Sequence, residues 1–175
     1  MIKRICLHGP ESTGKSTMAT LLASHLDCEI VPEYGRAYCE EHGTDSSMHD
    51  LVVIGQRTAA MITSAATRAA RGGGDWLIVD TDPVMTAVWA EMMHGKQDPW
   101  FGRFDNYADL YLLLDIDLAW VDDGLRFYGN PQDRQRFFDL SRAELERRGV
   151  NWALISGDGE PRFESALDAI ATLIG

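Results

Sequence analysis

The sequence predicts an α/β fold: a five-stranded parallel sheet flanked by helices, with a helical lid insert. Short apolar segments alternate along the chain with segments that carry helix-start and helix-stop signals, which is typical of β-α-β units. Most of the apolar segments are continuous rather than alternating, as expected for strands that are buried on both faces of a parallel sheet. The five expected strands are 2–8, 28–33, 76–81, 109–115 and 151–156.

The helices between these strands are predicted from their end signals. An Asp or Asn followed by Pro is a strong helix-start signal. The Asp or Asn side chain accepts a hydrogen bond from a free backbone N–H of the first turn, and Pro has no backbone N–H that would need a partner there. A glycine readily takes the left-handed conformation that ends many helices. The expected helices are 15–26, an alanine-rich one from Asp50 to Arg71, one from Asp82-Pro83 to Gly95, one from Asn130-Pro131 to Gly149, and a last one that opens at Glu160-Pro161.

The composition limits the partners of the chain. Its 175 residues include 16 Lys and Arg against 27 Asp and Glu, a net charge of −11, so its overall field repels nucleic acid and anionic lipid. No apolar run approaches the roughly 20 residues that a membrane-spanning helix needs. We expect a single domain over 1–175 in the cytoplasm, with no nucleic-acid or membrane partner; no homo-oligomer is predicted.

The loop after the first expected strand carries a complete phosphate-binding motif, G-x-x-x-x-G-K-[ST]. It opens the first helix, where backbone N–H groups and the positive helix end surround phosphates. We expect Lys15 to reach the β- and γ-phosphates of ATP, and the Ser16 hydroxyl to bind Mg²⁺. The motif predicts a P-loop NTPase fold. Its expected nucleotide-binding residues are Gly9, Glu11, Ser12, Thr13, Gly14, Lys15, Ser16 and Thr17.

The third expected strand ends in a carboxylate, Asp80, as in a Walker B segment. With Ser16, Asp80 is expected to hold Mg²⁺ directly or through water. Asp82 follows two residues later and has two alternatives, a helix cap or a substrate-binding residue. The sequence pattern alone leaves both open.

The size of the chain and its carboxylates favour a small-molecule kinase. No guanine-reading Asn-Lys-x-Asp tetrapeptide occurs, which argues against a GTPase. Glu33 ends the second expected strand, where open α/β sheets place ligands, and could deprotonate or orient an acceptor hydroxyl. The alternatives are a solvated Glu33 paired with Arg36 and, for the whole protein, an ATP-binding switch without a small-molecule acceptor.

The segment 117–139 between the fourth and fifth strands is rich in charge and glycine, and we expect it to be a mobile lid. Arg126, Arg134 and Arg136 lie in it, and a guanidinium fork suits a phosphoryl group. The alternative is that these arginines balance nearby aspartates at the surface.

Four motifs occur together in a specific order: the P-loop, Glu33-Tyr34-Gly35-Arg36, Asp80-Thr81-Asp82, and Trp120-Val121-Asp122-Asp123-Gly124-Leu125-Arg126 followed by Arg134 and Phe137. Together they resemble the nicotinamide riboside kinase domain of the NadR family over nearly the whole chain. The resemblance implies transfer of the ATP γ-phosphate to the 5′-hydroxyl of nicotinamide riboside, a step of NAD salvage. It also implies catalysis by Lys15, Glu33, Asp80 and Arg126, ATP contacts from Arg126 and Arg134, and substrate contacts from Glu33, Tyr34, Arg36, Asp82 and Asp123.

The chain departs from the family at two positions. Where the family has aromatic residues that stack on the nicotinamide ring, this chain has Pro32 and Met61. Loss of such stacking points to a different base as an alternative acceptor, unless Tyr34, Trp89, Trp100 or Tyr107 compensates. A kinase of another nucleoside or small metabolite therefore stays open.

Overall fold

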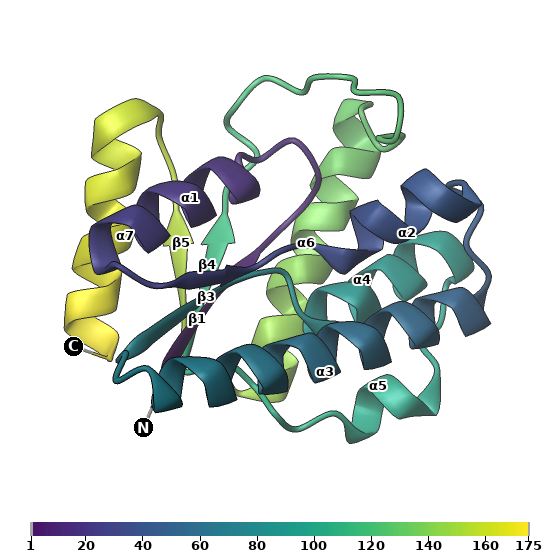
Figure 1. Ribbon diagram of the computed structural model, residues 1–175. Helices are drawn as coiled ribbons and strands as arrows, with labels where there is room; N and C mark the ends of the chain where they lie inside the picture. Colours follow the sequence, from purple (N-terminus) through teal and green to yellow (C-terminus); the bar gives the residue numbers. More distant parts are fainter. Residues whose placement is uncertain (1, 175) are drawn as a thin grey trace.

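The computed structural model describes residues 2–174 and has five parallel strands in the order β2-β3-β1-β4-β5 (Figure 1). The predicted α/β fold with a five-stranded parallel sheet is confirmed. β1 lies at the centre, with its Leu7 beside Asp80 of β3, so the strands end together at the edge where the P-loop leaves the sheet. The strands are β1 Lys3–His8, β2 Glu29–Val31, β3 Trp76–Asp80, β4 Leu110–Leu114 and β5 Trp152–Ile155.

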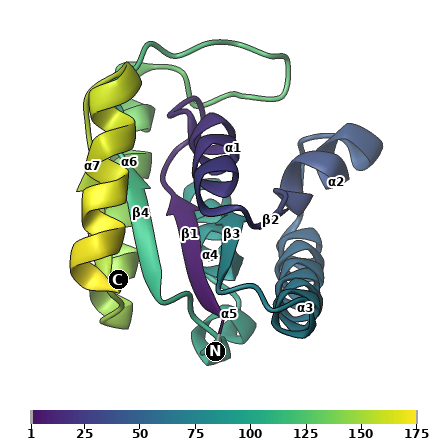
Figure 2. The ribbon, with the colours of Figure 1, turned by 60° about the vertical axis from the view of Figure 1, so that its left-hand side comes forward.

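Helices cover both faces of this sheet (Figure 2). Helices α1 and α7 pack on one face, and α3, α4 and α6 pack on the other. The helices are α1 Lys15–Leu26, α2 Tyr34–His42, α3 Met48–Arg71, α4 Pro83–His94, α5 Pro99–Arg103, α6 Pro131–Arg148 and α7 Gly159–Leu173. None of the helices within residues 2–174 combines the length and the apolar character that crossing a membrane requires.

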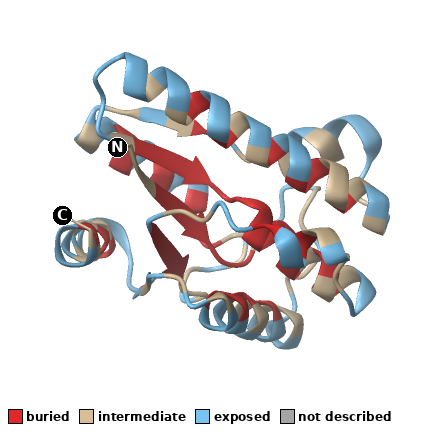
Figure 3. Cartoon of the chain, turned by 90° about the horizontal axis from the view of Figure 1, so that it is seen from below, coloured by how far each residue is buried: buried red, intermediate tan, exposed pale blue. Residues whose placement is uncertain are grey.

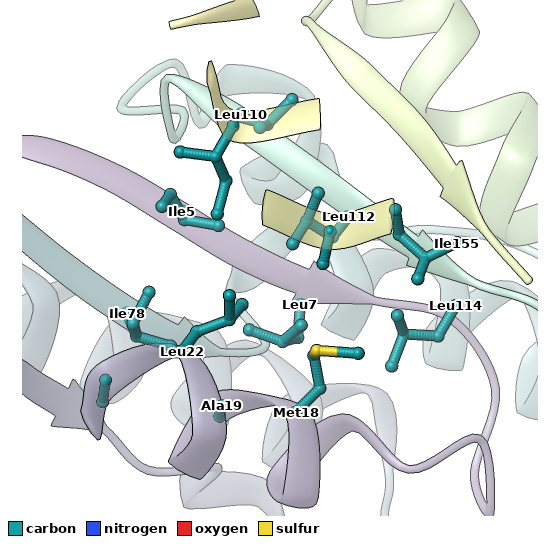
Figure 4. Close-up of a cluster of buried hydrophobic side chains, with 13 residues drawn as sticks. Ile5, Leu7, Met18, Ala19, Leu22, Ile78, Leu110, Leu112, Leu114 and Ile155 are labelled. Carbon is teal, nitrogen blue, oxygen red and sulfur yellow. The ribbon is translucent and has the colours of Figure 1, made fainter. Parts of the chain in front are cut away.

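Alternate side chains of the strands feed two separate cores. Ile5 and Leu7 of β1 meet Met18 and Leu22 of α1 (Figure 4), whereas Cys6 between them faces the opposite core. The central strands are therefore buried on both faces, and exposed residues gather on the outer sides of the helices (Figure 3). This arrangement explains why the strand segments read as continuous apolar runs.

Several helix ends differ from the prediction. Helix α3 is capped by Ser47 rather than Asp50; Asp50 is the third residue of a capping box, with its carboxylate accepting from the Ser47 backbone. Helix α7 begins at Gly159, after its cap Asp158, and not at Glu160-Pro161. Helices α2 and α5 were not predicted. α2 has no buried residue and no side-chain cap, so it lacks the apolar stripe and the start signal on which a sequence prediction depends.

The segment 117–139 is only partly helical. Residues 117 and 118 belong to a turn after β4, residues 119–130 form an irregular loop, and residues 131–139 are the first turns of α6. In the loop, Asp122 accepts from the Gly124 N–H at 2.9 Å and Asp123 accepts from the Leu125 N–H at 3.1 Å. Such local bonds compete with helical ones, which explains why the predicted helical lid is a loop here. In Figure 1 the loop arches over the turn between β1 and α1.

Asp82 lies in a buried polar network behind β3. One of its oxygens caps α4 by accepting from the Val84 N–H at 2.9 Å, and the other accepts from the Tyr111 hydroxyl at 2.6 Å. The Tyr111 oxygen in turn accepts from the Ala108 N–H at 3.2 Å. Burial raises the pKa of Asp82, and its hydrogen bonds to Tyr111 and to Val84 act in the opposite direction. Asp82 is thus a structural cap that ties α4 to β4.

Replacement of Tyr111 by Phe should lower the free energy of unfolding by about 1–3 kcal/mol, because it leaves a buried carboxylate oxygen without its donor. Urea denaturation followed by circular dichroism measures this change. Tyr38→Phe is the matched control, since Tyr38 donates a hydrogen bond of the same length, 2.6 Å, to Asp50 at a less buried place. An equal loss of stability in both variants would contradict the role given to burial.

Candidate functional site

The P-loop is shaped by residues with positive φ. Gly9 has φ 125° and Gly14 has φ 81°, and Ser12 takes the same left-handed region at φ 59°. A Cβ atom at Gly9 would come within 2.9 Å of the Leu114 carbonyl oxygen, so this position needs glycine for space as well as for conformation. The loop therefore lies directly on the end of β4.

Lys15 is the buried cation of the loop. Its Nζ donates to the carbonyl oxygens of Gly9 at 3.0 Å and Pro10 at 2.6 Å, and its side chain lines the cavity described below. The Thr13 hydroxyl also donates to Pro10, at 2.9 Å. These bonds hold the ammonium group over the concave side of the loop, where the motif places phosphates.

Ser16 and Asp80 lie together, as the sequence predicts. The Ser16 hydroxyl donates to Oδ2 of Asp80 at 2.6 Å, and Oδ1 of Asp80 is buried without a partner among residues 2–174. A hydroxyl and an uncommitted carboxylate oxygen suit a hard cation such as Mg²⁺. No cluster of three or more His, Cys, Asp or Glu that could hold a metal occurs in the described chain.

A cavity of about 190 Å³ opens beside the loop, at the carboxyl ends of the strands. The P-loop residues from Glu11 to Thr17 form one wall, and residues of α2, α3, α4 and the 119–130 loop form the others. The wall opposite the P-loop is largely apolar and includes Leu51, Ile54 and Trp89. The cavity thus has a part along the P-loop and a part lined by α3 and α4, which we call the second compartment.

Glu33 and Arg36 line the cavity from the acceptor side. The half-buried Glu33 is the residue before α2, and its side chain makes no capping bond to that helix. Burial raises the pKa of Glu33, while Lys15 counteracts this effect. The alternative pairing with Arg36 is not found: Arg36 bonds to Asp123 at 2.6 Å instead.

The three lid arginines have different places. Arg126 lines the cavity, donates to the Val121 carbonyl at 2.6 Å and pairs with Asp123 at 3.2 Å. Arg134 is not among the residues that line the cavity, and it donates to the carbonyls of Leu118 at 2.7 Å and Ser12 at 3.3 Å. Arg136 is exposed and away from the cavity. Asp123 thus joins Arg126 of the lid to Arg36 of α2, whereas Arg134 supports the loop backbone.

The P-loop side chains Glu11 and Ser12 also hold the lid. Oε1 of Glu11 accepts from the backbone N–H groups of Phe127 at 2.9 Å and Tyr128 at 2.7 Å, and the Ser12 hydroxyl accepts from that of Val121 at 2.9 Å. Burial raises the pKa of Glu11, and the two N–H donors partly offset this rise. Both residues were expected as nucleotide ligands; in this structure their side chains bind the lid.

Two residues of the site were not found from the sequence. Arg162 of α7 is buried under the P-loop, donates to the Thr13 carbonyl at 3.1 Å, and pairs with Asp117 at 2.5 Å. No local pattern distinguishes it from other helical arginines. Thr81 lines the cavity with φ 70°, which is rare for a β-branched residue and is fixed by its position between Asp80 and the cap Asp82.

Other expected substrate-binding residues lie outside the cavity wall. Tyr34 packs with Leu51 and Ile54 in the core beside α3. The buried Asp82 accepts hydrogen bonds from Val84 and Tyr111, which corrects its expected substrate contact.

Of the residues at the family's aromatic positions, Pro32 is exposed and Met61 packs against the core on the α3 face of the sheet. Among the aromatics considered as substitutes, Trp89 lines the cavity, whereas Trp100 and Tyr107 pack against Phe104 away from it.

Comparisons with known proteins agree with this geometry. Residues 4–162 match the family described as AAA domain. The trifunctional NAD biosynthesis/regulator protein NadR of Escherichia coli K12 is 30% identical over 183 aligned positions, which cover 99% of this chain and 43% of that protein. A crystal structure of NadR in complex with NR superposes with a TM-score of 0.83 at 22% identity, covering 98% of this chain and 51% of the other. Thymidylate kinase from Ehrlichia chaffeensis gives 0.70 at 15% identity, covering 98% of both.

Replacement of Asp80 by Asn should reduce the gain in nucleotide affinity that Mg²⁺ provides by about tenfold, because the uncommitted carboxylate oxygen is lost. Calorimetric titration with a non-hydrolysable ATP analogue, with Mg²⁺ and with a chelator, measures the gain. The affinity measured with the chelator is the reference for this gain and should not fall, because the variant loses a negative charge that repels the metal-free triphosphate. An undiminished effect of Mg²⁺ in the variant would contradict a metal role for Asp80.

Proposed function

Because the chain belongs to the AAA domain family and has an acceptor-like compartment beside its P-loop, we propose that it is an ATP- and Mg²⁺-dependent small-molecule kinase. The acceptor that we propose is nicotinamide riboside, which would give the mononucleotide and ADP as a step of NAD salvage. The similarity to the NadR protein supports this acceptor; this chain spans less than half of that protein's length. The observation that carries the proposal is that Glu33, Lys15 and Arg126 line one cavity.

The second compartment favours phosphoryl transfer over simple hydrolysis. A switch ATPase needs a place for the phosphates and for one water molecule. This cavity continues past the P-loop to α3 and α4, where Leu51, Ile54 and Trp89 provide an apolar wall. A carboxylate, Glu33, lines the same cavity and is close enough to Lys15 and Asp80 for their charges to affect its pKa, so it is available to an acceptor hydroxyl near the phosphate site.

In the reaction that we propose, the 5′-hydroxyl oxygen of the acceptor bonds to the γ-phosphorus as the bond to the β–γ bridging oxygen breaks, and ADP leaves. Glu33 orients the hydroxyl and takes its proton. Lys15 and Arg126 offset the negative charge on the phosphoryl oxygens. Ser16 and Asp80 would hold Mg²⁺, which when bound neutralises phosphate charge. The Arg36–Asp123–Arg126 chain links the acceptor side to the lid.

One observation favours a second candidate, a kinase of another nucleoside. Pro32 and Met61 do not line the cavity, so the ring of an acceptor cannot be held from these positions. All the residues given a role above would act in the same way on such an acceptor. The two candidates differ only in the compartment walls, and a panel of nucleosides in an ADP-release assay separates them.

Replacement of Glu33 by Gln should lower kcat by about 100-fold and leave KM for ATP nearly unchanged, because it removes the proton acceptor but not the phosphate site. Burial raises the pKa of Glu33, so this carboxylate takes up a proton at a pH where carboxylates with an ordinary pKa are still ionised. Wild-type activity should therefore fall in that pH range as the pH decreases. This acid limb should be absent from the residual activity of the variant. A coupled assay of ADP release with nicotinamide riboside, at a series of pH values, measures both effects.

Glu40→Gln is the matched control, since Glu40 lies on the same helix α2 but is exposed and outside the cavity wall. It should leave kcat and the pH profile unchanged. ADP release that does not depend on any small acceptor, and that Glu33→Gln leaves intact, would contradict the kinase and favour the switch.

A further inference from the structure

The lid places an aromatic side chain over the second compartment. Phe127 lines the cavity, and 43% of its surface is exposed. Trp89 of α4 lines the same cavity, with its ring centroid 5.6 Å from that of Phe127 and the ring planes at 60°. The two rings form one continuous aromatic wall from two elements that lie far apart in the sequence.

This wall is fixed from both sides. Trp89 packs edge-on against the buried Phe137 of α6, with ring centroids 4.7 Å apart. Phe127 is held through its backbone, because its N–H and that of Tyr128 both donate to Oε1 of Glu11. A side chain of the P-loop thus determines where the lid aromatic lies.

The chemistry of the wall suits a flat heteroaromatic ring. Stacking on an aromatic side chain tolerates many ring types, because it depends on the π-face and on excluded water. Tryptophan is also the best aromatic partner of a cationic ring.

We propose that Trp89 and Phe127 bind the planar ring of the acceptor, and that Glu11 acts through Phe127 as a positioning residue. The assignment rests on the proposed kinase function and adds the specificity determinants of its acceptor site. Arg126, which faces the transferred phosphoryl group in that proposal, directly precedes Phe127. Correct placement of the lid over ATP would therefore also complete the ring site.

The test compares two acceptors with the same ribose and amide: nicotinamide riboside, whose ring is an aromatic cation, and its dihydro form, whose ring is neutral and not aromatic. Phe127→Ala should weaken binding of nicotinamide riboside about tenfold and that of the dihydro form much less. Phe127→Tyr should restore the preference. Calorimetric Kd values in the presence of a non-hydrolysable ATP analogue provide the readout, and kcat/KM ratios provide a second one.

Leu154→Ala is the matched control, because Leu154 of β5 has a similar exposed fraction, 46%, and lies outside the cavity wall. It should change neither affinity. If the wild type phosphorylates nicotinamide riboside but Phe127→Ala affects both acceptors equally or not at all, the ring assignment is overturned. The proposed kinase function is not affected by that result. If another nucleoside is the acceptor, its binding is compared with that of methyl riboside, which has no ring base. A Phe127→Ala variant that loses affinity for the nucleoside but not for methyl riboside supports the ring assignment and rejects only nicotinamide riboside as the acceptor. Binding of no nucleoside by the wild type overturns both.

The role of Glu11 has its own test. Glu11→Ala and Phe127→Ala should each weaken acceptor binding, and the double variant should be no weaker than Phe127→Ala alone, because one residue acts through the other. Glu11→Gln keeps an oxygen acceptor and should restore most of the affinity. Additive losses would show that Glu11 does not act through Phe127 and would overturn its positioning role.

Discussion

The site depends on how the backbone of the P-loop is held at the end of the sheet. Its carbonyl oxygens cannot point toward phosphates, so each needs a donor behind or beside the loop. Lys15 supplies this for Gly9 and Pro10, and Arg162 supplies it for Thr13 from the far end of the chain. Arg162 also bonds to Asp117, where the lid segment begins. The loop, the lid and α7 therefore share one buried cation.

The lid connects the two compartments of the cavity. It is bound to the P-loop through Glu11 and Ser12, and to α2 through the pairing of Asp123 with Arg36. The two parts of the cavity are therefore linked by a short chain of hydrogen bonds through the lid. This arrangement suits an enzyme in which the terminal phosphate and the acceptor must be brought together while water is excluded.

The sequence predicts the parts of the site that are local in the chain. The P-loop residues are consecutive, Asp80 ends a recognisable strand, and Asp82 and Asn130 precede proline at helix starts, so each has a signal within a few residues. The contacts of Arg162, of Glu11 with the lid, and of Asp82 with Tyr111 join segments 29 to 149 residues apart. Such partners depend on how the elements pack, and no pattern in one sequence identifies them. Trp89 was named from the sequence as an aromatic that could compensate, but its pairing with Phe127 of the lid was not predicted, for the same reason.

The charges around Lys15 explain how a protein with a net charge of −11 can hold a polyanion. Burial raises the pKa of Glu33. Lys15 and Asp80 both lie close enough to affect it as well: Lys15 lowers this pKa, and Asp80 raises it further. One lysine cannot offset these carboxylates and a triphosphate together. Mg²⁺ held by Ser16 and Asp80 would reduce the repulsion between these carboxylates and the phosphates, and Arg126 would offset charge from the lid side. Nucleotide, metal and lid are therefore expected to bind as one cooperative unit, in which the acidic groups select for the metal-bound nucleotide over the free one.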